Sequence, residues 1–340
     1  MLQFININEQ SKVPKYEQIV NSILTAISNG DVVLNQKLPS VNQLLIEYDV
    51  SRDTIVHAYD NLKKRKIIES VPGKGYYIIN DQLTLRAKVF LLFNKLSAHK
   101  KLIYDAFSKT LGQTATIDFF IYDNDFGHFS QLIRSSKSRE YTHYVIISHF
   151  DEGGGNLVDF LQTELPLDQL IVLDKKIDGL ENKVAAVYQD FEKNIYSALT
   201  ELNPSLKKYK QLKLLFDNKT YQPKEIKKGF IRFCGEYAYD FEVLDSMDKE
   251  AITGGTAYIN LKEDDLVSLI KKIKNTDFAL GQNVGIISYN DTPLKEVLLE
   301  GITVISTDFQ KLGKQAAQLV LNNNKAQFEN PFYVIQRKSL

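Results

Sequence analysis

Residues 37–79 read KLPSVNQLLIEYDVSRDTIVHAYDNLKKRKIIESVPGKGYYII, and this stretch decides the fold of the N-terminal part of the chain. Ser40 and Ser51 each stand where a helix N-cap is expected, directly before a run with apolar residues at helical spacing. Two short apolar strands follow at 67–71 and 76–79, on either side of a tight Gly-Lys-Gly turn. Two helices running into a hairpin predict a winged helix-turn-helix, a fold that holds DNA.

The second of these helices is the expected recognition helix. Its buried stripe leaves Arg52, Thr54 and His57 on the outward-facing N-terminal turns, where such a helix meets base edges and phosphates. The basic run 63–66 lies between this helix and the wing, and Lys74 at the wing tip is expected to point at a phosphate. The residues expected to contact DNA are Ser40, Asn42, Ser51, Arg52, Thr54, His57, Lys74 and Gly75.

The chain has 340 residues and a net charge of zero, which fits two or three domains and only a local contact with DNA. One DNA-binding domain, called the head below, would make few phosphate contacts and bind DNA weakly. We therefore expect a homodimer that binds two half-sites. The single cysteine, Cys234, excludes an internal disulfide framework and is expected to fill a core. The sequence shows neither an apolar run of membrane length nor a signal peptide, so we expect a cytoplasmic protein without a membrane partner.

A third helix ahead of the motif completes the predicted head. Apolar residues at helical spacing predict it over 15–29, closed by Asn29 and Gly30. With it the segment resembles the DNA-binding domain of GntR-type bacterial regulators, in five features: Pro14, Tyr16, Gln18 and Ile19; Ile27 and Gly30; and the strings LPS, SRDTI and GKGYYI. Asn42 stands where that family usually has an arginine, and an asparagine can still bond adenine or a phosphate oxygen.

The remainder of the chain alternates short buried strands with helices, which indicates parallel sheets with right-handed crossovers. Polar residues predict a linker at 80–87, between a DNA-binding domain at 1–79 and an α/β domain at 88–340. So many elements favour two doubly wound lobes with a cleft between them. Strands are expected at 88–93, 116–122, 144–148, 170–173, 212–216, 241–244, 256–259, 284–288 and 332–335, and helices at 99–111, 126–136, 157–164, 194–202, 224–234, 264–273 and 312–321. Residues 330–340 are expected either to pair beside a sheet edge or to hang free.

Open parallel sheets bind ligands beyond the carboxyl ends of their strands. The loops at these ends carry amides, carboxylates and aromatic rings, which suit a polyhydroxyl ligand. Any one of these residues could instead be a helix cap or a turn former. The expected ligand residues are Asn94, Ser97, His149, Asp174, Lys219, Tyr221, Asn260, Asn290 and Phe309.

Residues 281–321 resemble the closing part of a LacI-type effector domain, which has the periplasmic sugar-binding-protein fold, and a weaker similarity begins at Lys88. The resemblance implies that Asn290 takes the place of a sugar-binding acid, that Phe309 lines the pocket and that Asp174 lies at its mouth. Ile226 stands where that family generally has a sugar-clamping arginine, so the ligand contacts on this side are expected to differ.

An enzyme is the alternative to a regulator. The run 153–155 is all glycine, but it lacks the ending of a P-loop and the spacing of a dinucleotide fingerprint. The sequence has no G-x-S-x-G elbow and no paired-histidine metal motif, and we expect no catalytic residue, metal or cofactor. The sequence therefore predicts a DNA-binding transcriptional regulator, most simply a repressor, whose affinity for operator DNA responds to a small sugar. The alternative is a sugar- or sugar-phosphate-processing enzyme with an accessory DNA-binding domain.

Overall fold

The computed structural model describes residues 4–8, 14–28, 30–80, 87–219 and 221–340. The chain divides into two compact units between Arg86 and Ala87. Residues 81–86 of the predicted linker, and Asn29 at the predicted end of the first helix, lie outside the described residues.

The first unit has three helices and a hairpin. Its elements are α1 (Lys15–Ser28), α2 (Val41–Tyr48), α3 (Arg52–Lys64), β1 (Ile68–Val71) and β2 (Gly75–Ile78). The two strands pair antiparallel, with Ile68 opposite Ile78 and Val71 opposite Gly75. The predicted winged helix-turn-helix is therefore confirmed.

Local interactions fix the two helices of the motif. Ser40 and Gln43 form a reciprocal capping box at the start of α2, and the Ser51 hydroxyl accepts from the Thr54 amide at the start of α3. Asp49, between the helices, has a left-handed backbone that aspartate tolerates. The fully buried Tyr59 donates its hydroxyl proton to the Pro39 carbonyl at 2.6 Å, which ties α3 to the entry of α2.

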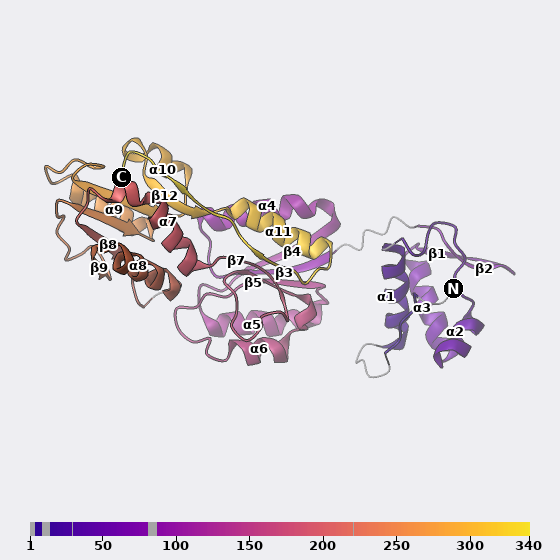
Figure 1. Cartoon of the computed structure of the whole chain (residues 1–340). Helices are drawn as coiled ribbons and strands as arrows, with labels where there is room; N and C mark the ends of the chain where they lie inside the picture. The colour runs from indigo at the N-terminus through magenta and orange to yellow at the C-terminus, as the bar shows by residue number, and fades with distance from the viewer. Residues whose placement is uncertain (1–3, 9–13, 29, 81–86, 220) are drawn as a thin grey trace. The chain divides into compact units, whose positions relative to one another are not determined.

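The second unit begins with a lobe whose six-stranded sheet is parallel throughout, in the order β13-β7-β6-β5-β3-β4. Helices α4 and α11 cover one face, and α5 and α6 cover the other (Figure 1). The bounds are β3 (Ala87–Phe93), α4 (Ala98–Leu111), β4 (Ala115–Ile121), α5 (Phe126–Ser136), β5 (His143–Ile147), α6 (Leu157–Glu164), β6 (Leu170–Asp174), β7 (Ala185–Tyr188), α11 (Phe309–Leu321) and β13 (Gln327–Glu329).

The second lobe repeats this plan. Its sheet has the order β14-β12-β11-β10-β8-β9 and is parallel except for β14, which pairs antiparallel with β12. Helices α7 and α8 pack on one face and α9 on the other. The bounds are α7 (Phe191–Leu206), β8 (Gln211–Leu215), α8 (Lys224–Tyr237), β9 (Asp240–Leu244), β10 (Thr256–Asn260), α9 (Glu263–Ile273), β11 (Val284–Tyr289), α10 (Pro293–Val297), β12 (Thr303–Thr307) and β14 (Phe332–Ile335). Cys234 is buried in the α7–α8 core, as the sequence predicts.

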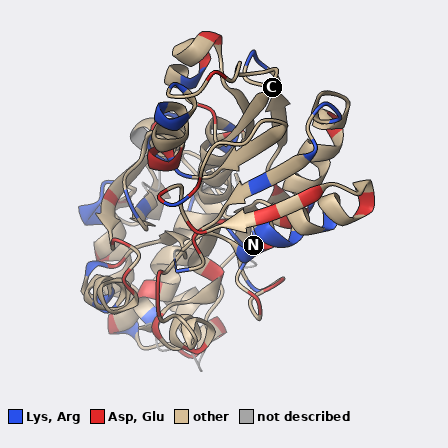
Figure 2. Ribbon diagram, turned by 90° about the vertical axis from the view of Figure 1, so that its left-hand side faces the viewer, with Lys and Arg blue, Asp and Glu red and all other residues tan. Residues whose placement is uncertain are grey.

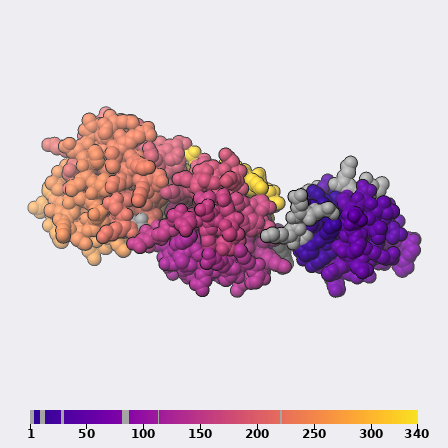
Figure 3. All heavy atoms as spheres, turned by 90° about the horizontal axis from the view of Figure 1, so that it is seen from below, coloured from indigo at the N-terminus to yellow at the C-terminus, as the bar shows by residue number. Residues whose placement is uncertain are grey.

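The chain passes between the lobes at three places, which lie between β7 and α7, between β12 and α11, and between β13 and β14. Asn330 joins all three. Its backbone amide donates to the Tyr188 carbonyl at 2.7 Å, and its side-chain amide donates to the Thr307 hydroxyl at 2.6 Å and to the Asp308 carbonyl at 2.9 Å. In the space-filling view the orange second lobe and the magenta first lobe are adjoining bodies (Figure 3).

The predicted alternation of strands and helices is confirmed, and the structure adds three strands and the short helix α10 that were not predicted. The sequence analysis did not predict β7, β12 or β13, which are three to five residues long. The segment 332–335 pairs at the edge of the second sheet, so the first of the two alternatives for the C-terminal end is correct. Lys and Arg are interspersed with Asp and Glu over the ribbon, in keeping with the zero net charge (Figure 2). Among the residues that the structure describes, every helix is too short or too polar to span a bilayer.

The α7–α8 contact provides a test of this packing. A Cβ added at Gly229 would overlap the Glu192 carbonyl oxygen and would lie 2.6 Å from Ile195 Cγ2. We therefore expect Gly229→Ala to lower the free energy of unfolding by about 1–3 kcal/mol in a urea titration, because the helices must separate. Gly235→Ala, in the same helix and facing open space, is the matched control and should raise it by roughly 0.5–1 kcal/mol. Equal stability of the two variants would contradict the packing described here.

Candidate functional site

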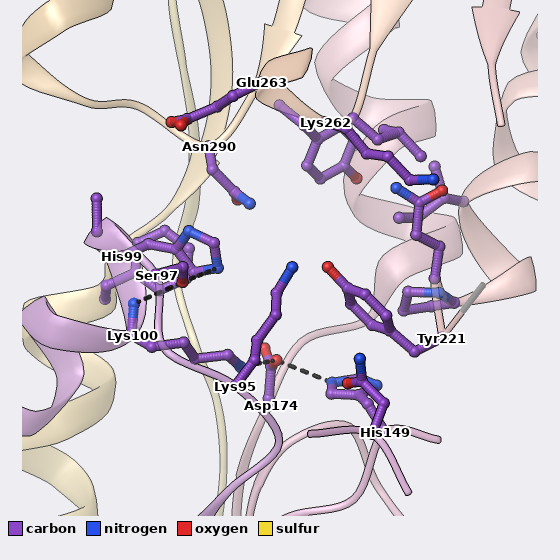
Figure 4. A pocket seen from close by; sticks show the side chains of 18 of the residues that line it. Lys95, Ser97, His99, Lys100, His149, Asp174, Tyr221, Lys262, Glu263 and Asn290 are labelled. Atoms are coloured by element: carbon purple, nitrogen blue, oxygen red, sulfur yellow. Dashed lines mark hydrogen bonds and ion pairs between the residues drawn. The ribbon is translucent and has the colours of Figure 1, made fainter. Parts of the chain in front are cut away.

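A cavity of about 560 Å³ lies between the two lobes of the second unit, at the carboxyl ends of both sheets. Figure 4 shows side chains from both lobes that point into it. The first lobe contributes Lys95, Leu96, Ser97, Ala98, His99, Lys100, Asn124, His149, Asp151, Asp174, Gln189 and Phe309, and the second contributes Phe191, Tyr221, Gln222, Pro223, Ile226, Leu261, Lys262, Glu263, Asp264, Tyr289, Asn290 and Lys295.

Asp174, at the end of β6, is the centre of a buried polar network in the first lobe. Its side chain accepts hydrogen bonds from Lys100 Nζ and His149 Nε2, both at 2.9 Å, and from Gln189 Nε2. Burial raises the pKa of Asp174, but the Lys100 ammonium and the His149 hydrogen bond outweigh it and hold this pKa well below its usual value. Burial lowers the pKa of His149 despite its bond to Asp174, so the ring is neutral at pH 7 and Nε2–H donates. The carboxylate is thus charged and its position is fixed.

The start of α4 forms the adjacent wall. Ser97 caps this helix by accepting from the Lys100 amide at 3.3 Å, and its hydroxyl lies 3.1 Å from His99 Nε2. The His99 ring lies against Phe309, with ring centres 4.9 Å apart. Burial, together with the neighbouring Lys100, lowers the pKa of His99 to about 3, so this imidazole offers the cavity a neutral donor or acceptor.

Asn290, directly after β11, stands on the opposite wall. Its backbone has φ of 62°, and its amide donates to the Ile305 carbonyl at 2.8 Å. Lys295 is buried behind it and donates to the carbonyls of Tyr289 and Asn290, both at 2.7 Å. Burial lowers the pKa of Lys295 to about 8. These bonds hold the backbone of Asn290, and its side chain points into the cavity (Figure 4).

The lobes touch each other across the mouth of the cleft. The Tyr221 amide of the second lobe donates to Asp151 Oδ1 of the first at 2.9 Å, and Lys175 forms an ion pair with Glu225 at 3.0 Å. Lys95 Nζ lies 4.5 Å from the centre of the Tyr221 ring. A ligand in the cavity would therefore contact both lobes at once.

Six of the nine ligand residues expected from the sequence line this cavity, namely Ser97, His149, Asp174, Tyr221, Asn290 and Phe309. The other three lie outside its lining. Asn94 is buried and donates to Asn124, Asn260 is buried and donates to Ser288 and to the Lys262 carbonyl, and Lys219 is exposed. The side-chain NH₂ groups of these two asparagines bond to neighbouring segments of their own lobes, and both side chains lie outside the lining of this cavity.

Several lining residues escaped the sequence analysis. Lys100 and His99 lie in the first turn of a helix, where lysine and histidine are ordinarily solvent-exposed, and Gln189 follows a strand that was not predicted. Lys262 and Glu263 are the N-cap and first residue of α9, just beyond Asn260, so two lining residues lie in the loop that the strand-end rule identified.

The predicted DNA-contacting residues all belong to the first unit, and they fall into two groups. The hydroxyls of Ser40 and Ser51 are occupied as helix caps, and that of Thr54 lies 2.8 Å from the Ser51 hydroxyl. Gly75 begins β2 with φ of 113°, in a conformation that favours glycine. The second group is Asn42, Arg52, His57 and Lys74, whose side chains are exposed and do not cap a helix, with the His57 ring stacked 4.2 Å from that of Tyr16.

Comparison with known proteins agrees with this division. Residues 15–78 match the family described as bacterial regulatory proteins, gntR family. The HTH-type transcriptional repressor YtrA of Bacillus subtilis is 33% identical over 104 residues, which are 30% of this chain and 78% of YtrA. The chain belongs to the gntR family. The HTH-type transcriptional repressor NagR of Bacillus subtilis is 32% identical over 74 residues, 22% of this chain and only 30% of NagR. The uncharacterized HTH-type transcriptional regulator YdfD of the same organism is matched over 18% of its length.

Solved structures cover the second unit of this gntR-family chain. The trehalose repressor from Escherichia coli aligns with a TM-score of 0.62 at 15% identity, over 73% of this chain and 99% of the repressor. A LacI family regulator, CCPA from Weissella paramesenteroides with bound glucose, aligns with a TM-score of 0.61 at 17% identity, over 75% and 98%. At these identities the likeness shows the fold, and the predicted LacI-type, two-lobed architecture is confirmed.

The buried Asp174 network gives a pH-dependent prediction. Asparagine, like aspartate, tolerates the φ of 77° at position 174, so Asp174→Asn removes the charge that pairs with Lys100 without straining the backbone. We expect the free energy of unfolding at pH 7 to fall by about 3 kcal/mol. A carboxyl whose pKa is lowered by folding stabilises the protein above its unfolded-state pKa. The gap between parent and variant in urea titrations should therefore be constant from neutral pH down to about 5 and narrow below about 4.

Asp105→Asn is the matched control. Asp105 pairs with Lys101 one helical turn away and is half exposed, so its loss should change stability by about 0.5 kcal/mol or less. A gap between parent and Asp174→Asn that widens as the pH falls below 4 would refute the assigned direction of the Asp174 pKa.

Proposed function

We propose that this protein is a DNA-binding transcriptional regulator, most simply a repressor, whose operator affinity is set by a small sugar or sugar derivative in the cleft. The main support is that one chain contains both a gntR-type winged helix and a two-lobed domain. This domain has a polar cavity at the carboxyl ends of both sheets. No catalytic reaction is assigned to the cleft.

The head has the surfaces that DNA binding needs. The first turns of α3 expose Arg52 and His57, which would reach base edges and phosphates, and the exposed run 63–66 lies at the other end of the same helix. Lys74 extends from the wing turn, whose shape is set by the Lys74 amide bonding to the Val71 carbonyl at 3.0 Å. These few cations give one head modest affinity, which supports binding as a homodimer to two half-sites.

The cavity has the size and chemistry of a small-molecule site. Its volume is in the range of about 300–1,000 Å³ usual for such pockets. Hydroxyl, amide, imidazole and carboxylate groups surround it, and the rings of Tyr221 and Phe309 offer faces for a sugar ring. The relatives named above as repressors, and the glucose bound in the CCPA structure, favour the same reading.

The three crossings between the lobes offer a way to couple ligand binding in the cleft to DNA binding. A ligand that contacts both lobes favours one angle between them, and in a dimer held through these lobes that angle sets the spacing of the two heads. Coupling free energies of this kind are about 1–3 kcal/mol, and operator DNA must change ligand affinity by the same factor.

Replacing Arg52 with Ala tests the head. We expect operator affinity in a gel-shift titration to fall by about ten- to a hundredfold, because a base or phosphate contact worth about 1–3 kcal/mol is lost. Ligand-induced thermal stabilisation should be unchanged. Arg232→Ala, which removes an exposed arginine from α8, is the control and should bind the operator like the parent. An Arg52→Ala variant with parental operator affinity would remove α3 as the recognition helix.

Replacing Asn290 tests the cleft. Glycine is the appropriate substitute, because the φ of 62° at this position would strain an alanine and confuse lost binding with lost stability. We expect Asn290→Gly to lose the rise in melting temperature that a bound sugar gives the parent in a thermal-shift screen of monosaccharides, with basal operator affinity unchanged. Full retention of the shift would place the ligand site elsewhere.

A further inference from the structure

Lys95 is placed differently from the other lysines of the cavity. It follows β3 by two residues, and its side chain extends into the middle of the cavity toward the Tyr221 hydroxyl (Figure 4). Its Nζ lies over the face of the Tyr221 ring, and within the described residues it forms no ion pair with a carboxylate. A cation–π contact of this kind leaves the donors of the ammonium available.

The remaining lysines that line the cavity have partners. Lys100 pairs with Asp174 at 2.9 Å, Lys262 pairs with Asp217 at 3.1 Å, and Lys295 donates to two backbone carbonyls. Four acids line the cavity: Asp174 is paired, Asp151 accepts from the Tyr221 amide at 2.9 Å, and Glu263 and Asp264 lie in the first turn of α9. Glu263 reaches the cavity from the second-lobe wall beside Asn290, on the side away from Lys95 (Figure 4). The cavity therefore has at one end a lysine that forms no ion pair within the described residues, with Asp151 bonded to the neighbouring Tyr221 amide, and at the other end the exposed carboxylates of Glu263 and Asp264.

Other groups support this polarity. The first turn of α4 lies at the Lys95 end of the cavity, and the positive end of the helix dipole adds positive potential there. Burial is the largest cause of the lowered pKa of His99. The charges of Lys100, Lys95 and Lys295 also lower this pKa and only Asp174 raises it, which agrees with a positive potential around the His99 ring. Tyr289 and Gln222, which also line the cavity, each have a buried oxygen without a protein partner within the described residues, so the polar groups beside the cavity are not all satisfied by the protein.

We propose that the ligand of the cleft carries an anionic group, a phosphate ester or a carboxylate on a sugar, that pairs with Lys95. This inference rests on the proposed function and narrows its ligand class. The anion binds between Lys95, Ser97 and the Tyr221 hydroxyl, and repulsion from Glu263 turns the sugar hydroxyls toward Asn290. Since Lys95 and Tyr221 belong to different lobes, the anion also bridges them.

The test uses the full-length protein and thermal-shift titrations at constant ionic strength. The probes are inorganic phosphate with chloride as the reference, neutral glucose and galactose, their phosphate monoesters and their uronic acids. We expect phosphate to raise the melting temperature more than chloride does, and one anionic class to do so more than its neutral sugar. The phosphate-ester and uronic-acid arms distinguish the two sources of the charge.

Three variants assign the effect to one residue. Lys95→Gln should weaken phosphate or anionic-sugar binding about tenfold or more, because a charge-assisted contact is removed. Lys95→Arg keeps the charge and should retain binding within a few-fold. Lys109→Gln removes the same charge from an exposed position of α4 outside the cavity lining and should behave like the parent. Both glutamine variants keep the basic residues of the DNA-binding unit, so phosphate bound there would stabilise them equally.

The outcomes separate the two proposals. The inference is overturned if phosphate and every anionic sugar stabilise no more than their references, or if Lys95→Gln responds like the parent. Stabilisation of parent and Lys95→Gln alike by neutral sugars would overturn it while leaving the proposed function intact. A compound that stabilises the protein through Lys95 but leaves operator affinity unchanged would support the inference and contradict the proposed function.

Discussion

The cleft depends on the way Asn330 ties the three interlobe crossings together. The residue is 2% exposed, and its donors satisfy carbonyl or hydroxyl oxygens in both other crossings. A buried amide that loses such partners costs about 1–3 kcal/mol for each unsatisfied group. Asn330 therefore holds the three crossings to one another where the chain passes between the lobes. Because both sheets direct their parallel strands toward these crossings, the strand-end loops of the two lobes face one another.

Charge is distributed in the cleft according to how deeply each group is buried. Asp174 is buried and has three donors around it, as a buried carboxylate requires, and it orients His149 and Lys100 toward the cavity. Lys95 and Glu263 are less buried and keep their charges available to a ligand. Asp174, His149 and Lys100 form a fixed part of the cavity wall. Lys95 and Glu263 make one end of the cavity positive and the other negative. Wall residues whose charges are already paired contribute shape and hydrogen bonds. The charge of the ligand is therefore selected by the groups that remain unpaired.

Sequence patterns located elements and loops better than they located side-chain partners. Caps such as Ser40 and Ser51 could be predicted, because their hydrogen bonds are local. Asp174 and Asn290 could be placed at the cleft, because the ends of parallel strands share one edge of a sheet. The role of Lys100 could not, because its partner is 74 residues away and its helical position suits a solvated lysine equally well. Asn94 and Asn260 show the converse, since polar residues at strand ends also serve to bind adjacent loops together.

The contacts across the cleft mouth are too weak to hold the lobes together on their own. Lys175 and Glu225 are each about one-third exposed, and such a pair is worth about 0–1 kcal/mol, while the bond from Tyr221 to Asp151 adds about 1 kcal/mol. These terms are comparable to the 1–3 kcal/mol typical of coupling between sites, so a bound ligand can outweigh these two contacts. An anion shared by Lys95 and the Tyr221 hydroxyl would act at the same mouth and add directly to these two contacts. The ligand would then serve as a structural link between the lobes, and the site that recognises it would be the site that sets the angle.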